Sequence, residues 1–284
     1  VDINTRTNMG WTPLLYAAEN GHLEVIRALL AEPRVDPEAR NNDGIITLAV
    51  AAWNGPADIV QFLLDDPWVD VNSCNRKGWT PLIFAAGDGH LKVVQVLLAD
   101  PRVDPEAGKG EDATALASAA CCGSAAIVKF LLSDSRIDVN ARTKMGWTPL
   151  MYAAQDGHLE VIQALLADLR VEPEARMDNG GTPLTVSASN NQANIVQVLL
   201  ADSQVDPNVH DNNSWTPLMS AAENGQLEAV QALLADPRID PEEKDEDGDT
   251  APTNAARHGR TAVVQILDDS RIDVNTRTST GWTS

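Results

Sequence analysis

Histidines at three equivalent positions, His22, His90 and His158, could in principle serve as metal ligands. Each is separated from the next by two copies of a repeat that is described below. Helices packed side by side lie about 8–10 Å apart, so these side chains are expected to be roughly 20 Å from one another. Zinc–ligand bonds are only about 2 Å long. The pattern therefore indicates a residue that the repeat itself uses, and we predict no metal site.

Adjacent thiols at Cys121 and Cys122 could support redox or metal chemistry. A reactive or metal-binding thiol needs neighbouring cations or further ligands, and the sequence shows none beside this pair. With Cys74 as the third cysteine, no evenly spaced disulfide framework exists, which indicates a reducing, intracellular setting. The acidic run at residues 245–249 lacks the ligand order and the closing acid of a calcium loop, and is expected to be an exposed turn.

The sequence contains no phosphate-binding loop, zinc-protease motif, nucleophile elbow or paired C-x-x-C motif. We therefore predict no enzyme activity, no catalytic residue and no cofactor. The 284 residues have a formal net charge of −20 and an isoelectric point near 4.4. This charge favours basic partners and argues against nucleic acid and anionic membranes. No apolar run approaches about 18 residues, so we predict no membrane helix and a cytoplasmic monomer.

These residues are positioned by a repeat that opens on Gly10-Trp11-Thr12-Pro13-Leu14. The same slot returns at a fixed interval and holds Ile46 once and otherwise Thr12, Thr80, Thr114, Thr148, Thr182, Thr216 or Thr250. Threonine can cap a helix N-terminus and proline suits the first helical position, so each copy predicts a helix start. About nine residues later stands a residue that tolerates the left-handed conformation at a helix end: Gly21, Gly55, Gly89, Gly123, Gly157, Asn191, Gly225 or Gly259.

A second apolar run follows in each copy, as at residues 22–30, where Leu23, Ile26 and Leu30 fall on one helical face. The phrase T-P-L-x-x-A-A, then G-H, then V/I-x-x-L-L, resembles the ankyrin repeat. The helix-encoding signature of tetratricopeptide repeats is absent. The resemblance implies an all-α solenoid of helix-turn-helix units with β-turn or hairpin fingers, curved as a right-handed array.

The resemblance covers essentially the whole chain, so we expect residues 1–284 to form a single array. Residues 1–9 match the end of a preceding repeat, eight repeats run from about 10 to 276, and residues 277–284 match the start of a further repeat. Both ends therefore look cut, as in a fragment of a larger multidomain protein. Odd repeats keep W-T-P-L whereas even repeats vary, so the working period of the sequence is a pair of repeats.

In proteins that this chain resembles, partners are held by the fingers and the exposed ends of the first helices, which line a concave groove. Tryptophan is enriched at binding hot spots, and an aromatic ring near carboxylates suits lysine or arginine. The candidate partner-binding residues are Trp11, Tyr16, Glu19, Asn20, Trp53, Asn54, Trp79, Asp88, Trp147, Tyr152, Asp156, Trp215, Glu223 and Asn224. The alternative is that the tryptophans only pack against the next turn.

Finger positions carry a basic row that could be a solvated rim or could orient an acidic partner segment: Arg6, Arg40, Arg76, Lys77, Lys109, Arg142, Lys144, Arg176, Lys244 and Arg277. The histidine expected after T-P-L is replaced by Leu15, Ile83, Met151 or Met219, which predicts that repeats are held more by apolar contact than by polar ties. The fourth repeat lacks the Trp, Pro and turn Gly at residues 108–115, and we expect local opening to begin there.

The sequence thus predicts a protein–protein interaction scaffold that binds a partner protein or peptide with basic segments in its concave groove. Two alternatives stay open. One is a structural spacer between flanking domains, which would show near-equal exchange protection in all repeats and capture no partner. The other is a small-molecule or catalytic site in the groove around Trp53, Asp88, Cys121 and Cys122.

Overall fold

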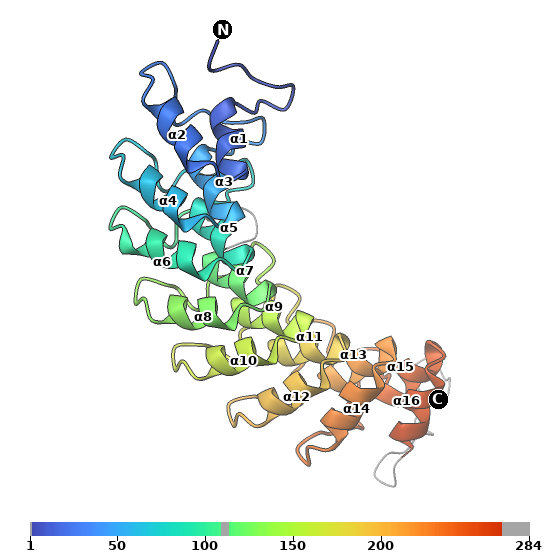
Figure 1. Ribbon diagram of the computed structural model, residues 1–284. Helices are drawn as coiled ribbons and strands as arrows, with labels where there is room; N and C mark the ends of the chain where they lie inside the picture. The colour runs from blue at the N-terminus through green and yellow to red at the C-terminus, as the bar shows by residue number, and fades with distance from the viewer. Residues whose placement is uncertain (1, 109–113, 269–284) are drawn as a thin grey trace. The chain divides into compact units, whose positions relative to one another are not determined.

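The computed structural model describes residues 2–108 and 114–268, and within these ranges the chain forms sixteen helices and no strand (Figure 1). The chain divides into two compact units, Val1–Thr143 and Lys144–Ser284, and each is described by itself. That both units belong to one continuous array stays a prediction. The predicted start of a further repeat at residues 277–284 lies outside the described residues.

Each repeat contributes a first and a second helix. In the first unit these are α1 (Pro13–Glu19) and α2 (Leu23–Leu30), α3 (Thr47–Asn54) and α4 (Ala57–Leu64), α5 (Pro81–Gly87) and α6 (Leu91–Ala99), and α7 (Ala115–Cys121) and α8 (Ala125–Leu132). In the second unit they are α9 (Pro149–Asp156) and α10 (Leu159–Leu166), α11 (Pro183–Ser189) and α12 (Ala193–Leu200), α13 (Pro217–Asn224) and α14 (Leu227–Leu234), and α15 (Ala251–Arg257) and α16 (Thr261–Leu267).

The predicted helix starts are confirmed. Six of the repeated threonines stand at the N-cap, and each side-chain oxygen accepts a hydrogen bond from the backbone N–H three residues on: Thr12, Thr80, Thr114, Thr148, Thr182 and Thr216. The predicted left-handed helix ends are confirmed too, since φ is +71° at Gly21 and still +59° at Asn191, where a side chain is present. Local residue chemistry therefore fixes where the helices begin and end.

Paired alanines allow the first helices of one unit to pack closely in a row. In the pairs Ala17-Ala18 and Ala85-Ala86 no residue is more than 4% exposed. Within the first unit α1, α3, α5 and α7 form one row and α2, α4, α6 and α8 form a second row beside it (Figure 1). The core of each unit lies between its two rows, so the ends of the first helices and the loops before them remain at the surface.

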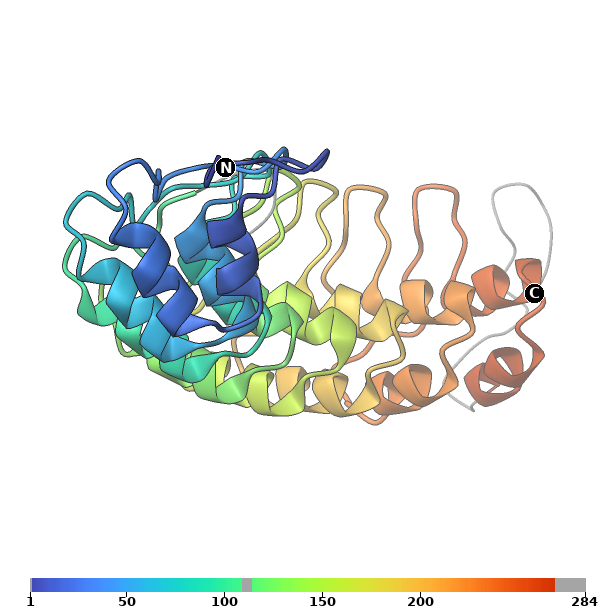
Figure 2. The same cartoon turned by 45° about the horizontal axis from the view of Figure 1, so that its top comes forward.

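The loops before the first helices are tight fingers. In the second unit the fingers before α11, α13 and α15 project to the same side of the helices (Figure 2). Each closes on itself, as where Asp211 N–H donates to the Trp215 carbonyl at 2.9 Å. Neighbouring fingers are also tied, because Asn212 N–H donates to the Asn179 carbonyl at 2.8 Å. The backbone carbonyl of Trp215 is therefore bonded across its own finger, and this finger is bonded to the preceding one.

Polar ties between repeats are present beside the apolar contacts. In the link after a second helix, Arg102 forms an ion pair with Asp100 at 2.6 Å and donates to the Leu64 carbonyl of the preceding repeat at 2.6 Å. Arg238 pairs with Asp236 at 2.7 Å and donates to the Leu200 carbonyl at 2.6 Å. We call this Asp-x-Arg arrangement the arginine clamp. It satisfies a carbonyl that the end of the preceding helix leaves without a partner.

The arginine clamps make stability depend on pH. Hydrogen bonds from the arginines hold the pKa of Asp100, Asp134, Asp168 and Asp236 below the usual value, which is about 3.9 for an unfolded aspartate. A lowered folded-state pKa contributes stability above the unfolded pKa, and this contribution is lost as pH falls through the folded pKa. Urea unfolding at pH 7 and at pH 3 should therefore show that Arg102→Gln costs less at pH 3. An equal cost at both pH values would contradict this origin.

The second repeat departs from the Thr-Pro order at Ile46-Thr47. Ile46 occupies the N-cap without a capping side chain, and the buried Thr47 hydroxyl has no hydrogen-bond partner among the described residues. Ile46 is already extended, with φ −95° and ψ 169°, which suits a residue before proline. Thr47→Pro is therefore expected to raise the free energy of unfolding by about 1 kcal/mol in urea titrations. Thr47→Val should recover only part of this gain, and a destabilised Thr47→Pro would contradict the interpretation.

No helix in the described part of the chain is long and apolar enough to cross a membrane. The predicted weak point in the fourth repeat falls largely on residues 109–113, which lie outside the described ranges, as do Lys109 and Arg277 of the basic row.

Candidate functional site

The C-terminal ends of the first helices, with the tryptophans and fingers before them, form a surface on each unit that we call the first-helix face. On the second unit this face holds an open pocket of about 360 Å³. Helices α9, α11 and α13 and the fingers between them supply its walls: Trp147, Gln155, Met177, Asn179, Gly181, Thr185, Val186, Ser189, Asn190, Asp211, Trp215, Ser220, Glu223 and Asn224. The predicted residues Trp147, Trp215, Glu223 and Asn224 are therefore brought to one place.

The even repeat in the pocket carries a glycine where the odd repeats carry tryptophan. Gly181 lies one repeat after Trp147 and one repeat before Trp215, and the Met177 side chain packs against it, with its methyl carbon 2.5 Å from where a Cβ at Gly181 would stand. Both indoles are half-buried. Trp147 packs against Tyr152 with ring centroids 5.2 Å apart, while the backbone N–H of Trp215 donates to Asp211 Oδ1 at 2.9 Å. The two tryptophans therefore stand two repeats apart in the lining, with Met177 and Gly181 of the intervening repeat between them in sequence.

Carboxylates give the pocket its charge. Asp211 Oδ1 already accepts backbone N–H groups from Asn213 and Trp215, which leaves its second oxygen for a partner. Glu223 lies near the end of α13, with its side chain 35% exposed and one oxygen 3.5 Å from His258 Nε2. Aromatic rings beside carboxylates form a site that suits an ammonium or guanidinium group.

The predicted asparagines also stabilise the ends of their helices. The side-chain N–H of Asn20 donates to the Tyr16 carbonyl at 2.8 Å, and Asn54 and Asn224 donate in the same way to Val50 and Ser220 at 2.9 Å. Each caps the end of its own helix. The amide oxygen is then the atom that can accept a hydrogen bond from a partner.

On the first unit the first-helix face carries an aromatic cluster across two repeats. The Phe84 ring lies 5.4 Å from that of Trp53, nearly stacked, and 5.3 Å from that of Trp79, edge-on. Trp53 remains 42% exposed although its neighbour Phe84 is buried. Trp11 packs on Tyr16 at 5.1 Å, and Tyr16 is 43% exposed. The tryptophans therefore pack on neighbouring rings and still present surface.

The predicted acids Glu19, Asp88 and Asp156 are exposed at the ends of α1, α5 and α9. Asp156 accepts a 3.4 Å hydrogen bond from Gln155, which lines the pocket. The odd repeats thus place an acid at one of two adjacent positions at the end of the first helix. This gives a negative character to the surface around the rings.

Three residues of the basic row join neighbouring fingers. Arg40 donates to the Cys74 carbonyl at 3.0 Å and Arg176 to the His210 carbonyl at 2.8 Å, each reaching the next repeat. Arg6 reaches the Arg40 carbonyl in the same way. These side chains therefore stabilise the fingers, and their charges are partly committed within the protein.

The three equivalent histidines stand at the start of the second helices, as predicted. His90 also joins repeats, because its Nε2 lies 2.9 Å from the Trp53 carbonyl. Gln226 and Arg260 occupy the same position later in the chain and donate to the carbonyls of Ser189 and Glu223, both at 2.8 Å. Side chains at this position therefore hold the C-terminal carbonyls of the preceding repeat's first helix in place.

The surroundings of Cys122 disfavour a reactive thiol. Partial burial of the sulfur, with Cys121 beside it, raises the pKa of the Cys122 thiol, which disfavours the thiolate. The expectation of an exposed turn at residues 245–249 is wrong for two of its acids, because Asp245 and Asp249 are buried. Asp245 closes a finger turn, accepting N–H groups from Asp247 at 3.0 Å and Asp249 at 2.8 Å. In the ranges 2–108 and 114–268, no three His, Cys, Asp or Glu side chains are placed to hold a metal ion.

Sequence reasoning missed the pocket residues of the even repeat, Met177, Asn179 and Gly181, and it missed the arginine clamps. A glycine in the tryptophan slot was a signal for the first. The recurrence of Asp-x-Arg at the same position of several repeats was a signal for the second.

Comparison with known proteins supports the repeat assignment. The chain matches the family described as ankyrin repeats in three copies over residues 1–72, 48–143, 104–176, 138–211, 169–245 and 201–278. A search of curated proteins found no match. Ankyrin repeats are generally protein–protein interaction modules, and proteins built from them are typically non-catalytic scaffolds. From these matches and from the capped helix pairs described above, the chain belongs to the ankyrin-repeat family.

Proposed function

We propose that this chain binds a partner protein through an extended basic segment that lies on the first-helix face. The observation that carries the proposal is the pocket of about 360 Å³ between Trp147 and Trp215, whose rim holds the acids Asp211 and Glu223. Lysine or arginine side chains of the segment would lie against one indole or the other, and their charges would meet the carboxylates. Backbone carbonyls and asparagine amides around the rim offer hydrogen bonds to the segment.

The aromatic cluster of Trp53, Phe84 and Trp79 supports a second contact on the first unit. Exposure of a tryptophan side chain to water at the end of a first helix is unfavourable in free energy. Tryptophans that contact partners are frequent binding hot spots. Asp88 follows one repeat after Trp53-Asn54 and supplies the nearby charge. The proposal therefore assigns an aromatic anchor and an acid to each unit's first-helix face.

The helix caps and the hydrogen bonds between fingers make the first-helix face rigid. This lowers the entropy cost of binding, because few surface groups need to be immobilised when a partner binds. The net charge of −20 would speed the approach of a basic segment and would make association weaken with salt. A spacer role without a partner remains the second candidate from the sequence, and the experiment below separates the two.

The test is affinity capture from a cell lysate with the native chain and with the variant Glu19→Lys, Asp88→Lys, Asp156→Lys and Glu223→Lys. Both proteins are first compared by circular dichroism to show equal helix content. Proteins with basic segments should be retained by the native chain and lost by the variant. Capture of the same set by both proteins would overturn the assignment to the first-helix face, and capture of none would favour the spacer.

A further inference from the structure

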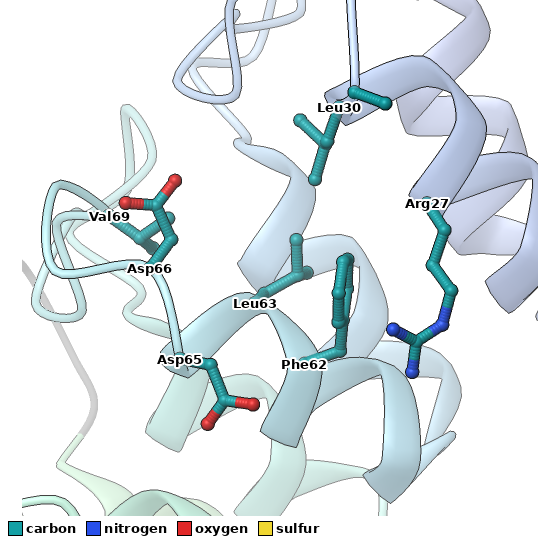
Figure 3. A pocket seen from close by; sticks show the side chains of 8 residues that line it. Arg27, Leu30, Phe62, Leu63, Asp65, Asp66 and Val69 are labelled. Atoms are coloured by element: carbon teal, nitrogen blue, oxygen red, sulfur yellow. The ribbon is translucent and has the colours of Figure 1, made fainter.

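A second pocket lies on the first unit, on the row of second helices and not on the first-helix face. It has a volume of about 490 Å³ and lies between the C-terminal ends of α2 and α4 (Figure 3). Leu30, Leu63 and Phe62 form its apolar part, with Arg27 at one end and Asp66 at the other (Figure 3). None of the sequence motifs discussed above accounts for a pocket at this place.

The pocket occupies the position that the arginine clamp fills in other repeats. Arg102 and Arg238 each pair with the aspartate two residues earlier and donate to the last carbonyl of the preceding second helix. In the second repeat the corresponding aspartate is Asp66, the corresponding carbonyl belongs to Leu30, and the arginine position holds Trp68. Trp68 is 86% exposed and is not among the residues that line the pocket.

The acceptors of the clamp are all present without its arginine. Asp66 Oδ1 accepts the Trp68 N–H at 2.9 Å, as Asp100 Oδ1 accepts the Arg102 N–H at 2.9 Å. The side chain of Asp66 is therefore held in the same turn. Among the described residues no hydrogen bond to the Leu30 carbonyl is found. A carbonyl at the end of a helix also carries the negative end of the helix dipole, which favours a cation.

The cation already at the rim does not fill this position. The Arg27 guanidinium lies 4.3 Å from the centre of the Phe62 ring and 3.7 Å from Glu24 Oε1, so its charge is directed to that side of the pocket. Asp65 adds a further carboxylate to the lining, where it accepts a 3.2 Å hydrogen bond from Gln61. The end of the pocket near Asp66 is therefore acidic and offers several acceptors.

We propose that this pocket receives an arginine side chain from a partner polypeptide, which would complete in trans the clamp that Arg102 and Arg238 make in cis. A guanidinium fits because its planar donors can pair with a carboxylate and a carbonyl at once, as they do in the clamps of Arg102 and Arg238. A lysine ammonium would lack this bidentate geometry. The apolar part of the pocket, Leu30, Leu63 and Phe62, would cover the methylene stem of the arginine. Trp68 stands exposed in the same turn as Asp66 and offers surface to the same partner.

This assignment is independent of the proposed function, because it concerns the second helices and rests on a comparison between repeats of one chain. The probe is the blocked tripeptide Gly-Arg-Gly, compared with its citrulline and lysine counterparts, titrated into the full isotope-labelled chain by two-dimensional amide NMR. We expect saturable shifts near residues 30–32 and 62–69 with Gly-Arg-Gly. The citrulline peptide should bind at least about tenfold more weakly, because it lacks the charge-assisted pair.

Trp68→Arg is the decisive variant, since it would supply the clamp in cis and fill the pocket. It should weaken Gly-Arg-Gly binding at least about tenfold while raising the thermal midpoint, which separates a filled pocket from a misfolded chain. Gln204→Arg introduces an arginine at the corresponding position of the second unit and should leave the binding reported by shifts near residues 30–32 and 62–69 unchanged. Trp68→Gln mirrors residue 204 and should keep the shifts at residues 30–32.

Three results would overturn the proposal. Equal affinity for the citrulline peptide would show that charge plays no part, and equal affinity for the lysine peptide would remove the assignment to arginine. Undiminished binding to a folded Trp68→Arg chain would show that the peptide lies elsewhere.

Discussion

Replacing Arg257 with alanine is expected to lower the free energy of unfolding of the second unit by about 3 kcal/mol. Arg257 forms an ion pair with Asp249, whose side chain is 0% exposed. The other carboxylate oxygen, Oδ1, has no hydrogen-bond partner in the described part of the chain. Removal of the guanidinium would leave a buried charge unpaired, and a buried charge costs far more than a lost surface contact. Urea unfolding followed by circular dichroism measures the change.

A double variant provides the control for this prediction. Asp249 stands at the tryptophan slot, where the sixth repeat has Gly181, so Asp249→Gly removes the charge without placing a larger group there. The double variant Asp249→Gly, Arg257→Ala should recover most of the stability that Arg257→Ala loses. If the single variant is as stable as the native chain, Asp249 is not held by this pair.

Arg238→Ala should destabilise the second unit by about 2 kcal/mol, because one side chain serves an aspartate and two carbonyls. Arg238 pairs with Asp236 at 2.7 Å and donates to Leu200 at 2.6 Å and Val205 at 3.2 Å. The salt bridge alone would be worth little, since the arginine side chain is 40% exposed. Most of the effect is expected from the carbonyl at the end of α12, which would lose its donor.

Gln204 is the matched control, because it occupies the same position one repeat earlier and makes no clamp. Gln204→Ala should change the free energy of unfolding by less than about 0.5 kcal/mol. An equal cost for Arg238→Ala and Gln204→Ala would show that the link is stabilised by packing alone. Both variants are measured by urea titration in the same buffer.

The fold could be predicted from the sequence because its signals are local. The Thr12 side chain accepts a hydrogen bond from the backbone N–H three residues on, and Pro13 occupies the first helical position, so the two residues mark a helix start. Gly21 marks the helix end because its φ is positive. Because these signals recur at a fixed spacing, a clear copy of the repeat identifies the helix bounds in the less clear copies. The exception at Ile46 was visible as a break in the pattern, but its consequence, the buried Thr47 hydroxyl without a partner among the described residues, depends on packing.

The candidate site could be predicted only in part. The Trp, acid and Asn positions follow from the repeat, yet the pocket is also lined by Met177, Asn179 and Gly181 of an even repeat, and only the fold brings these residues beside Trp147 and Trp215. The arginine clamps could not be paired from sequence either. Arg238 lies 38 residues from Leu200, so only the fold shows that the two atoms meet. The pocket beside Trp68 could not be predicted for the same reason. There the fold brings together hydrogen-bond acceptors for which the chain supplies no clamp arginine.

The most direct test of the central claim is the affinity of an extended basic peptide for matched charge variants. The probe is a fluorescent decapeptide of alternating Gly and Lys, which avoids the arginine-specific pocket, and its dissociation constant is measured by anisotropy at low and moderate salt. Asp156→Lys with Glu223→Lys changes the first-helix face, whereas Asp58→Lys with Glu160→Lys changes the net charge equally on the exposed side of second helices. We predict salt-sensitive binding to the native chain, at least about tenfold loss in the first variant and less than about threefold loss in the second. Equal losses in the two variants would show that net charge alone attracts the peptide, and would contradict recognition by the first-helix face.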